Sequence, residues 1–385
     1  MRVVFACPFV PWPLETGGNI RTYHLIRHAA EHVDLELRLV RLPQPDAAAE
    51  DAVRALGVPV EFCERGPVGL GTRLARPKIE RWFHSPRLAA SLARDAAGGT
   101  VDLLHLDELL LARAAPHPCP VPIAQHHHKI DTVLADRVGA AGLAARFDRF
   151  KLGGLERAAA ARTRHHITCS EGDAEFLRAR YPALETYAVP SGFDEDTFRP
   201  STPPPEREAD RLVFLGSMSY APNVDGVRWF AREILPALAE RRPEVKLTIV
   251  GRDPAPEVRA LAGERIEVTG AVDDVRPYLE RASLFLVPLR ICGGTRLKIV
   301  ESLALETPTV STTIGAEGLG LANGEQLALA DRPEEWIATC SELLEDRERA
   351  QALGRAGAAF VREHYRWPTL AARLADAWKQ IAERS

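Results

Sequence analysis

Residues 284–304 read LFLVPLRICGGTRLKIVESLA and contain a strand, a turn and the start of a helix. The apolar run 284–287 predicts a buried strand, because a short apolar run bounded by turn signals is typical of parallel sheets. Gly293 and Gly294 predict a tight turn, and Thr295 is a residue type that caps helices through its side-chain oxygen. The segment therefore predicts a βα unit of an α/β fold.

Short apolar runs alternate with longer amphipathic stretches along all 385 residues. This alternation is typical of βα units around parallel sheets. The first half predicts strands near 3–7, 35–40, 58–62, 103–106, 123–126, 166–169 and 186–189. The second half predicts strands near 212–215, 247–250, 266–269, 284–287, 309–312 and 326–329. We therefore expect an α/β fold with a parallel sheet in each half.

The segment FRPSTPPPE at residues 198–206 is dense in proline and polar residues. Proline lacks the amide donor that a sheet interior needs, so this segment predicts a domain boundary. We predict two doubly wound, Rossmann-like domains, 1–199 and 200–366, and a C-terminal helix, 367–385, that packs back across the hinge. Ligands of doubly wound sheets bind beyond the carboxyl ends of the strands, so a shared ligand would lie in a central cleft.

Composition and short motifs exclude several classes of protein. The chain has 49 basic and 53 acidic residues, a formal net charge of −4, so no nucleic-acid partner is expected. Its six cysteines lie singly, without the Cys-x-x-Cys pairs of structural zinc sites. No uncharged apolar run reaches the ~18–20 residues of a membrane span, and we expect a cytoplasmic protein. Segments 8–12 and 216–220 lack the dinucleotide fingerprint, which disfavours a nicotinamide or flavin dehydrogenase.

The predicted helix after Thr295 carries Arg296 and Lys298 in its first turn. Cations there oppose the helix dipole by ~0.3–1 kcal/mol each, whereas together with free backbone N–H groups they form a phosphate site. Glu301 shares a helix face with Lys298, and its carboxylate could reach a ribose diol beside that phosphate. The alternative is an exposed Lys–Glu pair after a flexible turn, which explains neither the glycines nor the misplaced cations.

Residues 288–318 resemble the donor-site signature of the glycosyl transferases group 1 family, retaining family 4 enzymes of GT-B fold, in the branch with a Gly-Gly-Thr-Arg motif. Further similar stretches in the second half are 216–223, 229–230, 249–252 and 269–278. The first half matches more loosely, at 17–21, 102–105, 170–173 and 189–194. The resemblance implies a nucleoside-diphosphate-sugar donor bound by the second domain and an acceptor bound by the first.

The resemblance also implies roles for individual residues of the donor domain. Glu301 would bind the ribose, and the base would lie near 269–276. The donor-binding residues implied are Gly216, Ser217, Arg252, Val272, Arg276, Cys292, Gly293, Gly294, Thr295, Arg296, Lys298 and Glu301.

The sequence departs from the family pattern at two places in this domain. Gly293 stands where the family usually has the first of two glutamates. Ser217 and Asp225 stand near the positions of the usual arginine and lysine after the domain's first strand. We infer that Arg296 and Lys298, with Arg252, neutralise the diphosphate instead.

Several residues of the first domain could bind the acceptor. Gly17-Gly18 permits close backbone approach to a ligand, although a plain turn is equally compatible with it. Strand alternation puts His105 and Asp107 on one face, and the family often has a second histidine where Asp107 stands. The acceptor-binding residues predicted are Gly17, Gly18, Arg21, His105, Asp107, His126 and His128.

The segment QHHHKID at residues 125–131 suggests a metal site at first inspection. Consecutive strand residues point to opposite faces, so at most His126 and His128 converge, and no third ligand is evident nearby. We therefore expect no metal, and the segment supplies either packed histidines or acceptor contacts.

The segment Arg65–Arg94 holds seven cations, interleaved with apolar residues, against a single acid, Glu80. Basic amphipathic segments can lie on anionic membranes, so peripheral contact with the inner face of the membrane is one interpretation. A solvated helix face is the alternative.

Together these features predict a retaining glycosyltransferase of hexosyltransferase type, which moves a sugar from a nucleotide to a hydroxyl of a small molecule, glycan or lipid-linked acceptor. The products would belong to polysaccharide, glycolipid or natural-product glycoside synthesis. The residues expected to carry the reaction are Arg296, Lys298, Glu301 and Asp107. We expect no cofactor and no metal, because the helix dipole and cations would stabilise the leaving diphosphate. The alternatives are a non-catalytic nucleotide-sugar-binding or scaffold protein and a sugar-nucleotide epimerase of the same fold.

Overall fold

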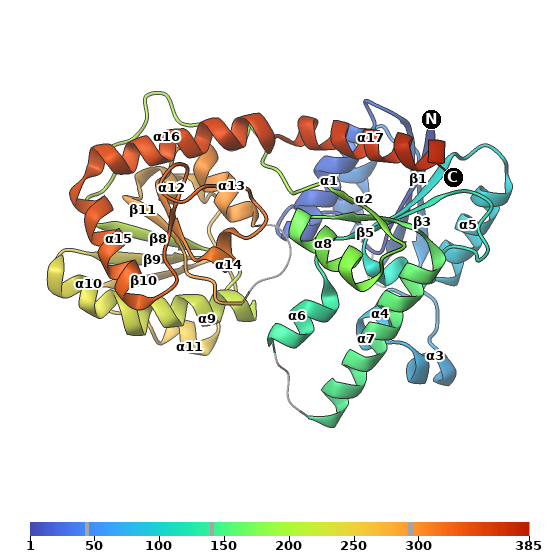
Figure 1. The fold of residues 1–385 in the computed structure, drawn as a ribbon, viewed down its shortest axis with the longest axis horizontal. Coiled ribbons are helices and arrows are strands. Elements are labelled where there is room, and N and C mark those ends of the chain that lie inside the picture. The colour runs from blue at the N-terminus through green and yellow to red at the C-terminus, as the bar shows by residue number, and fades with distance from the viewer. Residues whose placement is uncertain (43–45, 139–141, 292–295, 385) are drawn as a thin grey trace. The chain divides into compact units, whose positions relative to one another are not determined.

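The computed structural model describes residues 1–42, 46–138, 142–291 and 296–384 (Figure 1). The chain forms two compact units. The first comprises Met1–Ser191 and the C-terminal segment from Trp367, and the second comprises 192–291 and 296–366. The division therefore falls between Ser191 and Gly192, earlier than the expected 199/200, and the C-terminal helix is part of the first unit.

The first unit is built on a seven-stranded parallel sheet of order β3-β2-β1-β4-β5-β6-β7. Its strands are β1 (Arg2–Cys7), β2 (Asp34–Arg41), β3 (Val60–Glu64), β4 (Leu103–Leu106), β5 (Ile123–His127), β6 (His165–Thr168) and β7 (Glu185–Ala188). The strand order reverses between β1 and β4, which is the point where doubly wound sheets bind ligands. Strand β1 lies at the centre, and Val3–Cys7 are fully buried because both faces of the sheet are covered.

The helices of the first unit lie on both faces of this sheet (Figure 1). They are α1 (Gly17–Ala29), α2 (Ala47–Arg54), α3 (Leu70–Ala75), α4 (Lys78–Trp82), α5 (Pro86–Ala97), α6 (Asp131–Val138), α7 (Leu143–Arg162), α8 (Glu171–Arg180) and α17 (Trp367–Arg384). Helix α17 buries Leu370, Leu374 and Trp378 at helical spacing and packs against α1. The ring of Trp367 stacks on His24 of α1 with centroids 5.4 Å apart.

The second unit is built on a six-stranded parallel sheet of order β10-β9-β8-β11-β12-β13. Its strands are β8 (Arg211–Leu215), β9 (Lys246–Val250), β10 (Ile266–Gly270), β11 (Leu284–Val287), β12 (Thr309–Ser311) and β13 (Ala328–Leu329). Its helices are α9 (Ala221–Trp229), α10 (Leu235–Arg241), α11 (Pro256–Arg259), α12 (Arg276–Arg281), α13 (Leu297–Ala304), α14 (Thr313–Ala316), α15 (Pro333–Glu345) and α16 (Arg347–His364). The order reverses between β8 and β11, and α13 follows β11.

Every strand expected from the sequence is present, with ends that differ by at most two residues. The largest core side chain of the second unit, Trp336 of α15, packs edge-on against Trp229 and Phe230 at centroid distances of 6.4 and 5.5 Å. In the described part of the chain, no helix is both long enough and apolar enough to cross a membrane.

Candidate functional site

The turn after β8 brings Ser217, Asn223 and Lys298 together in the second unit. A Cβ atom on Gly216 would lie 2.5 Å from Asn223 Nδ2 and 2.8 Å from Lys298 Nζ, so any larger residue there would displace both polar groups. Lys298 Nζ donates a hydrogen bond to Asn223 Oδ1 at 2.8 Å. Asn223 Nδ2 in turn donates to the Ser217 carbonyl at 2.9 Å. An ammonium group is thereby fixed at the carboxyl end of β8, beside the switch point of the sheet.

Lys298 belongs to α13, the helix that follows β11. Its ammonium also lies 4.7 Å from the centre of the Phe214 ring, a cation–π contact that holds the side chain over the end of β8. Asn223 orients the ammonium and was not among the predicted site residues. Its only sequence signal is its position in the stretch 216–223 that resembles the family.

Glu301 lies one turn after Lys298 on α13 and is half-buried. Loss of hydration raises the pKa of this carboxyl to about 7, against a smaller lowering effect of the Lys298 ammonium. Near neutral pH the group therefore exists in both protonation states. A hydrogen-bonding partner for the carboxylate, such as a diol, would shift it to the charged form.

The other predicted cations of this unit are engaged in ways that the sequence did not indicate. Arg296 is buried and donates to the Ile314 carbonyl at 2.8 Å, with the Glu317 carboxylate at 3.4 Å. Arg276 forms a salt bridge with Asp274 at 2.8 Å and donates to the Thr197 carbonyl. In the structure Arg296 is thus engaged by Ile314 and Glu317, and its predicted contact with a diphosphate stays a prediction.

The other residues predicted to bind the donor are placed by the structure as follows. Val272 packs against the hydrophobic core of the unit, and the Arg252 carbonyl accepts a hydrogen bond from Met218 N at 2.9 Å. Helix α13 has Arg296 at its N-cap position, without a side-chain capping bond. Cys292, Gly293, Gly294 and the expected cap Thr295 lie outside the described residues.

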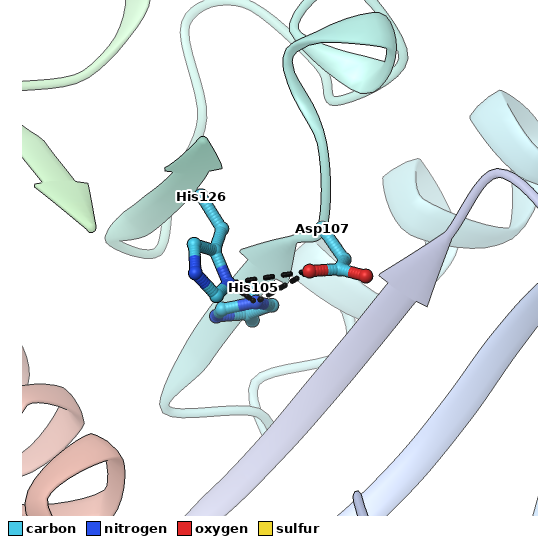
Figure 2. Close-up of side chains that lie close together, drawn as sticks. All are labelled: His105, Asp107 and His126. Atoms are coloured by element: carbon cyan, nitrogen blue, oxygen red, sulfur yellow. Dashed lines mark hydrogen bonds and ion pairs between the residues drawn. The ribbon is translucent and has the colours of Figure 1, made fainter. Parts of the chain in front are cut away.

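Buried polar side chains gather beyond the carboxyl ends of β4 and β5 in the first unit (Figure 2). His126 Nδ1 lies 3.2 Å from Asp107 Oδ1, and His105 Nε2 lies 3.3 Å from His126 Nδ1. His128 Nε2 approaches the same Asp107 oxygen at 2.7 Å, while Asp107 Oδ2 accepts a hydrogen bond from Thr22 Oγ1 at 2.7 Å. A single carboxylate thus organises three imidazole rings.

Two obligate donors fix the tautomers of the deeper histidines. The Trp378 indole N–H donates to His105 Nδ1 at 3.0 Å, so the proton of neutral His105 must be on Nε2. Arg21 Nη2 donates to His126 Nε2 at 2.8 Å, so the proton of neutral His126 must be on Nδ1. Both N–H groups therefore face Asp107, although His105 Nε2 is 3.8 Å from the carboxylate, beyond hydrogen-bond distance.

The charges of this cluster, which we call the Asp107 cluster (His105, Asp107, His126 and His128), follow from burial and from these contacts. Burial opposes ionisation of Asp107, but the charge of His128 and the nearby ring nitrogens of all three histidines hold its pKa well below the usual value. Burial and Arg21 lower the pKa of His126 well below its usual value. Burial opposes a charged His128, yet Asp107 and Glu108 raise its pKa. Burial and the neighbouring charges thus favour the charged form of His128 and the neutral forms of His105 and His126.

Glu108, which was not predicted, completes the environment of His128. Its Oε1 lies 3.2 Å from His128 Nδ1, on the ring edge opposite Asp107. Its backbone has φ 77° and ψ 142°, a region that is strained for any residue with a side chain. Such strain costs on the order of 1–3 kcal/mol and gathers at functional sites. The position of Glu108 directly after β4 is the only sequence signal for it.

His105, Asp107 and His126 also form a group whose ligand atoms are close enough to hold a metal ion. The donor chemistry does not fit this role. The lone pairs of the two rings accept hydrogen bonds from Trp378 and Arg21, so the nitrogens facing Asp107 carry protons. A metal ligand must offer a lone pair, so a metal here would break two buried hydrogen bonds.

The predicted acceptor-side residues do come together, but most lie too deep to touch a ligand in this conformation. Arg21 is buried, and it also donates to Ser191 Oγ at 3.0 Å and to the Val189 carbonyl at 2.6 Å. His105 and His126 have no exposed surface. The expectation of direct acceptor contact is corrected for these three side chains, whose contacts position Asp107 and His128.

Gly17 and Gly18 lie at the start of α1, which is capped by Thr16 Oγ1 accepting from Asn19 N at 3.2 Å. A Cβ atom on Gly18 would lie 3.9 Å from His128 Nδ1, so the two glycines adjoin the outermost ring of the Asp107 cluster. The plain-turn interpretation is incomplete, because these residues form the first turn of a helix.

Comparison with known proteins finds similarity to glycosyltransferases in the fold and in part of the sequence. Residues 209–346 match the sequence model of the family "Glycosyl transferases group 1". A GDP-mannose-dependent alpha-(1-6)-phosphatidylinositol monomannoside mannosyltransferase of Mycobacterium tuberculosis is 30% identical over 226 residues. A phosphatidyl-myo-inositol mannosyltransferase of the same organism is 26% identical over 207 residues. These matches cover 53% and 50% of this chain, which spans only 58% and 54% of the relatives' lengths.

Solved structures of other proteins resemble this chain over its whole length. Sucrose-phosphate synthase from Thermosynechococcus elongatus superimposes with a TM-score of 0.75 at 17% identity and full coverage of both chains. HepE from Anabaena, in complex with UDP and glucose, gives a TM-score of 0.72 at 16% identity, covering 99% of this chain and 100% of HepE. The fold is therefore the GT-B fold, with two doubly wound α/β units, as the sequence predicts.

Proposed function

We propose that this chain is a retaining glycosyltransferase that transfers a hexose from a nucleoside-diphosphate-sugar to an acceptor hydroxyl. The observation that carries the proposal is the fixed ammonium of Lys298 at Gly216 and Asn223, with Glu301 one helical turn later. This arrangement supplies a positive charge for a diphosphate and a carboxylate for a ribose at the carboxyl end of the sheet. The family match over 209–346 covers all of these residues.

In the proposed reaction, negative charge develops on the diphosphate as the glycosidic bond loosens. The ammonium of Lys298, held by Asn223 and Phe214, stabilises that charge without having to reorganise. Glu301 fixes the nucleotide by accepting hydrogen bonds from the ribose. The protein thus lowers the barrier chiefly by electrostatic stabilisation of the leaving group and by positioning.

The Asp107 cluster of the first unit is proposed to serve the acceptor or the transferred sugar. His128 lies nearest the surface, and its ring nitrogens face two carboxylates, Asp107 at 2.7 Å and Glu108 at 3.2 Å. These carboxylates raise its pKa, so we propose that it serves as a positive charge rather than as a general base. The buried histidines and Arg21 act as positioning residues for it.

The acceptor class is proposed from the relatives. The mannosyltransferases that match half of this chain are named for phosphatidylinositol substrates, and HepE was solved with UDP and glucose. A lipid-linked or glycan acceptor hydroxyl in polysaccharide, glycolipid or glycoside synthesis is therefore the best-supported class. We propose that this reaction takes place in the cytoplasm.

A panel of UDP- and GDP-hexoses incubated with the protein tests the proposal. A transferase releases nucleoside diphosphate, by transfer or by slow hydrolysis, and the anomeric configuration of the product is retained. Epimerisation would change the sugar without release and would support an epimerase. Binding of donors without either change, measured by calorimetry, would support a non-catalytic nucleotide-sugar-binding protein.

A further inference from the structure

A group of exposed apolar side chains lies on the first unit. These side chains belong to other segments and other helices than the residues of the Asp107 cluster. Seven of the eleven exposed large hydrophobic residues described belong to α3, α4 and the first half of α7. We call these residues the α3–α4–α7 surface: Leu70, Leu74, Ile79, Trp82, Leu143, Phe147 and Phe150. Leu143 is 83% exposed, Leu70 74% and Phe150 69%. Contiguous exposure of this kind marks an interaction site rather than a core.

The packing of α7 explains why these residues are exposed. Its second half contributes Leu155 and Ala159 to a core cluster with Leu109 and Ala112. In its first half, over residues 143–152, no side chain is buried. Helix α3 likewise has no buried residue. The second half of α7 is therefore anchored in the core of the unit. The apolar side chains of its first half are not buried there.

Two contacts join the three helices into one surface. Asp148 Oδ1 of α7 accepts a hydrogen bond from the backbone N–H of Lys78 in α4 at 2.8 Å. Lys151 Nζ of α7 donates to the carbonyl of Arg73 in α3 at 3.2 Å. These bonds join the first half of α7, which carries exposed apolar side chains, to α3 and α4, which also carry them.

The surface is also positively charged. Arg73, Lys78, Arg81 and Lys151 form no ion pair with any carboxylate in the described part of the chain, while Arg65 lies 4.6 Å from the centre of the Trp82 ring. Two acids lie in this region: Glu80 is buried and paired with Arg76 and Arg113, and Asp148 accepts a hydrogen bond from the Lys78 backbone.

The other cations of the segment Arg65–Arg94 behave differently. Arg87 pairs with Glu64 at 2.7 Å and Arg94 with Glu61 at 3.0 Å, both acids of β3. Within the basic segment predicted from the sequence, the arginines of α5 thus form ion pairs with acids of β3. The cations Arg73, Lys78 and Arg81 of α3 and α4 form none in the described part of the chain.

We propose that the α3–α4–α7 surface docks on an anionic lipid bilayer. Aromatic and aliphatic side chains on short helices suit the boundary between headgroups and acyl chains, and each basic residue near an anionic leaflet contributes about 1 kcal/mol. Charge complementarity favours a lipid over a second copy of this chain, because two copies would bring like charges together. The inference goes beyond the proposed function and does not depend on the donor chemistry.

Sedimentation with vesicles tests this surface without any sugar donor. The wild-type protein should pellet with vesicles of phosphatidylglycerol and phosphatidylcholine at 0.1 M salt and not with phosphatidylcholine alone. Binding should weaken at 1 M salt, because the Debye length falls from ~10 Å to ~3 Å. A Leu143→Ser, Phe147→Ser, Phe150→Ser variant should lose at least ten-fold in vesicle affinity, with unchanged melting because these side chains are exposed.

A matched control removes exposed hydrophobics elsewhere, with Tyr220→Ser and Ile314→Ser in the second unit. This variant should pellet like the wild type. The proposal is overturned if the wild type stays in the supernatant with anionic vesicles, or if the triple variant pellets equally well. Concentration-dependent self-association that the triple variant abolishes, without vesicle binding, would instead assign the surface to a second copy. None of these outcomes changes whether nucleotide is released from donors, so this proposal and the proposed function fail separately.

Discussion

The Asp107 cluster and the Lys298 site represent two ways of placing charge at the end of a parallel sheet. In the cluster, Asp107 accepts contacts from Thr22 and the histidines, and obligate donors behind the rings fix their protons. At the Lys298 site the ammonium donates a hydrogen bond to Asn223, and the pKa of the nearby Glu301 carboxyl is raised to about 7. The first unit thus sets its charges through contacts among its own buried side chains, whereas in the second unit a carboxyl beside a fixed ammonium can still change its charge when a ligand binds.

The largest effect is expected from Asp107→Asn. The amide keeps the shape but removes the buried negative charge that His128 requires, and breaking a buried ion pair typically costs about 3–5 kcal/mol. Urea unfolding should show a loss of this order, and activity should fall to background. The exposed Asp136→Asn is a matched control and should change stability little. An Asp107→Asn protein as stable as wild type would mean that the cluster is not organised by this carboxylate.

Substitution of Lys298 by alanine should affect catalysis more than stability. Removing a preorganised charge from the developing diphosphate typically costs 10²–10³-fold in kcat, about 2.7–4 kcal/mol. Steady-state nucleotide release should report this loss, while the melting temperature should move little. Lys246→Ala, at an exposed end of β9, serves as control. Wild-type turnover in Lys298→Ala would remove the site from the mechanism.

Glu301 gives a pH test of the same site. Because the pKa of the Glu301 carboxyl is about 7, the charged form, which we propose binds the ribose, is lost as pH falls through 7. Affinity for the nucleoside diphosphate should therefore fall several-fold between pH 8 and pH 6 in the wild type. In Glu301→Gln affinity should be lower at pH 8 and nearly independent of pH. Calorimetry at both pH values decides the point, and a parallel pH dependence in the two proteins would assign the titration to another group.

The same group affects stability with a defined sign. Its folded pKa is raised above the ordinary value, so the folded state binds more protons than the unfolded state between about pH 4.5 and 7. This carboxyl should therefore make the ligand-free protein more stable as pH falls from 7 to 4.5. The difference in unfolding free energy between wild type and Glu301→Gln should shift in that direction, and a shift with the opposite sign would contradict a raised pKa of Glu301.

A smaller effect is expected from Trp378→Phe, which tests how strictly the tautomers of the first unit are set. Losing the indole N–H leaves His105 Nδ1 without its donor and should cost about 1 kcal/mol. Nitrogen chemical shifts of His105 should show the Nε2–H tautomer in the wild type and a mixture in the variant. An unchanged tautomer would show that the Asp107 side of the ring decides the proton position.

No effect at all is expected from a strong chelator. In the proposed mechanism Lys298 supplies the positive charge that a divalent ion supplies in other transferases, and the ring nitrogens of His105 and His126 that face Asp107 carry protons rather than free lone pairs. Nucleotide release should be the same before and after chelation. Activity that disappears with chelator and returns with manganese would refute the metal-free mechanism.

The sequence by itself determined the α/β class, the positions of all the strands and the juxtaposition of Lys298 and Glu301 on one helix. These features depend on periodicity and on spacing within a few residues, which any single stretch of chain displays. It also placed His105 and Asp107 on one face of a strand, because alternation is a local property.

Only the tertiary structure decided which of these polar groups are accessible to a ligand and which are buried and hydrogen-bonded within the fold. Arg21 is bound by Val189 and Ser191, and His105 by Trp378, partners that are 168, 170 and 273 positions away in the chain. Arg296 donates a hydrogen bond to the Ile314 carbonyl, and Asn223 of α9 accepts one from Lys298 of α13. The protonation states and burial of these side chains arise from contacts between distant segments, which local spacing does not encode. The same reason explains why the basic segment could be recognised in the sequence, while its apolar partner on α7 emerged only from the fold.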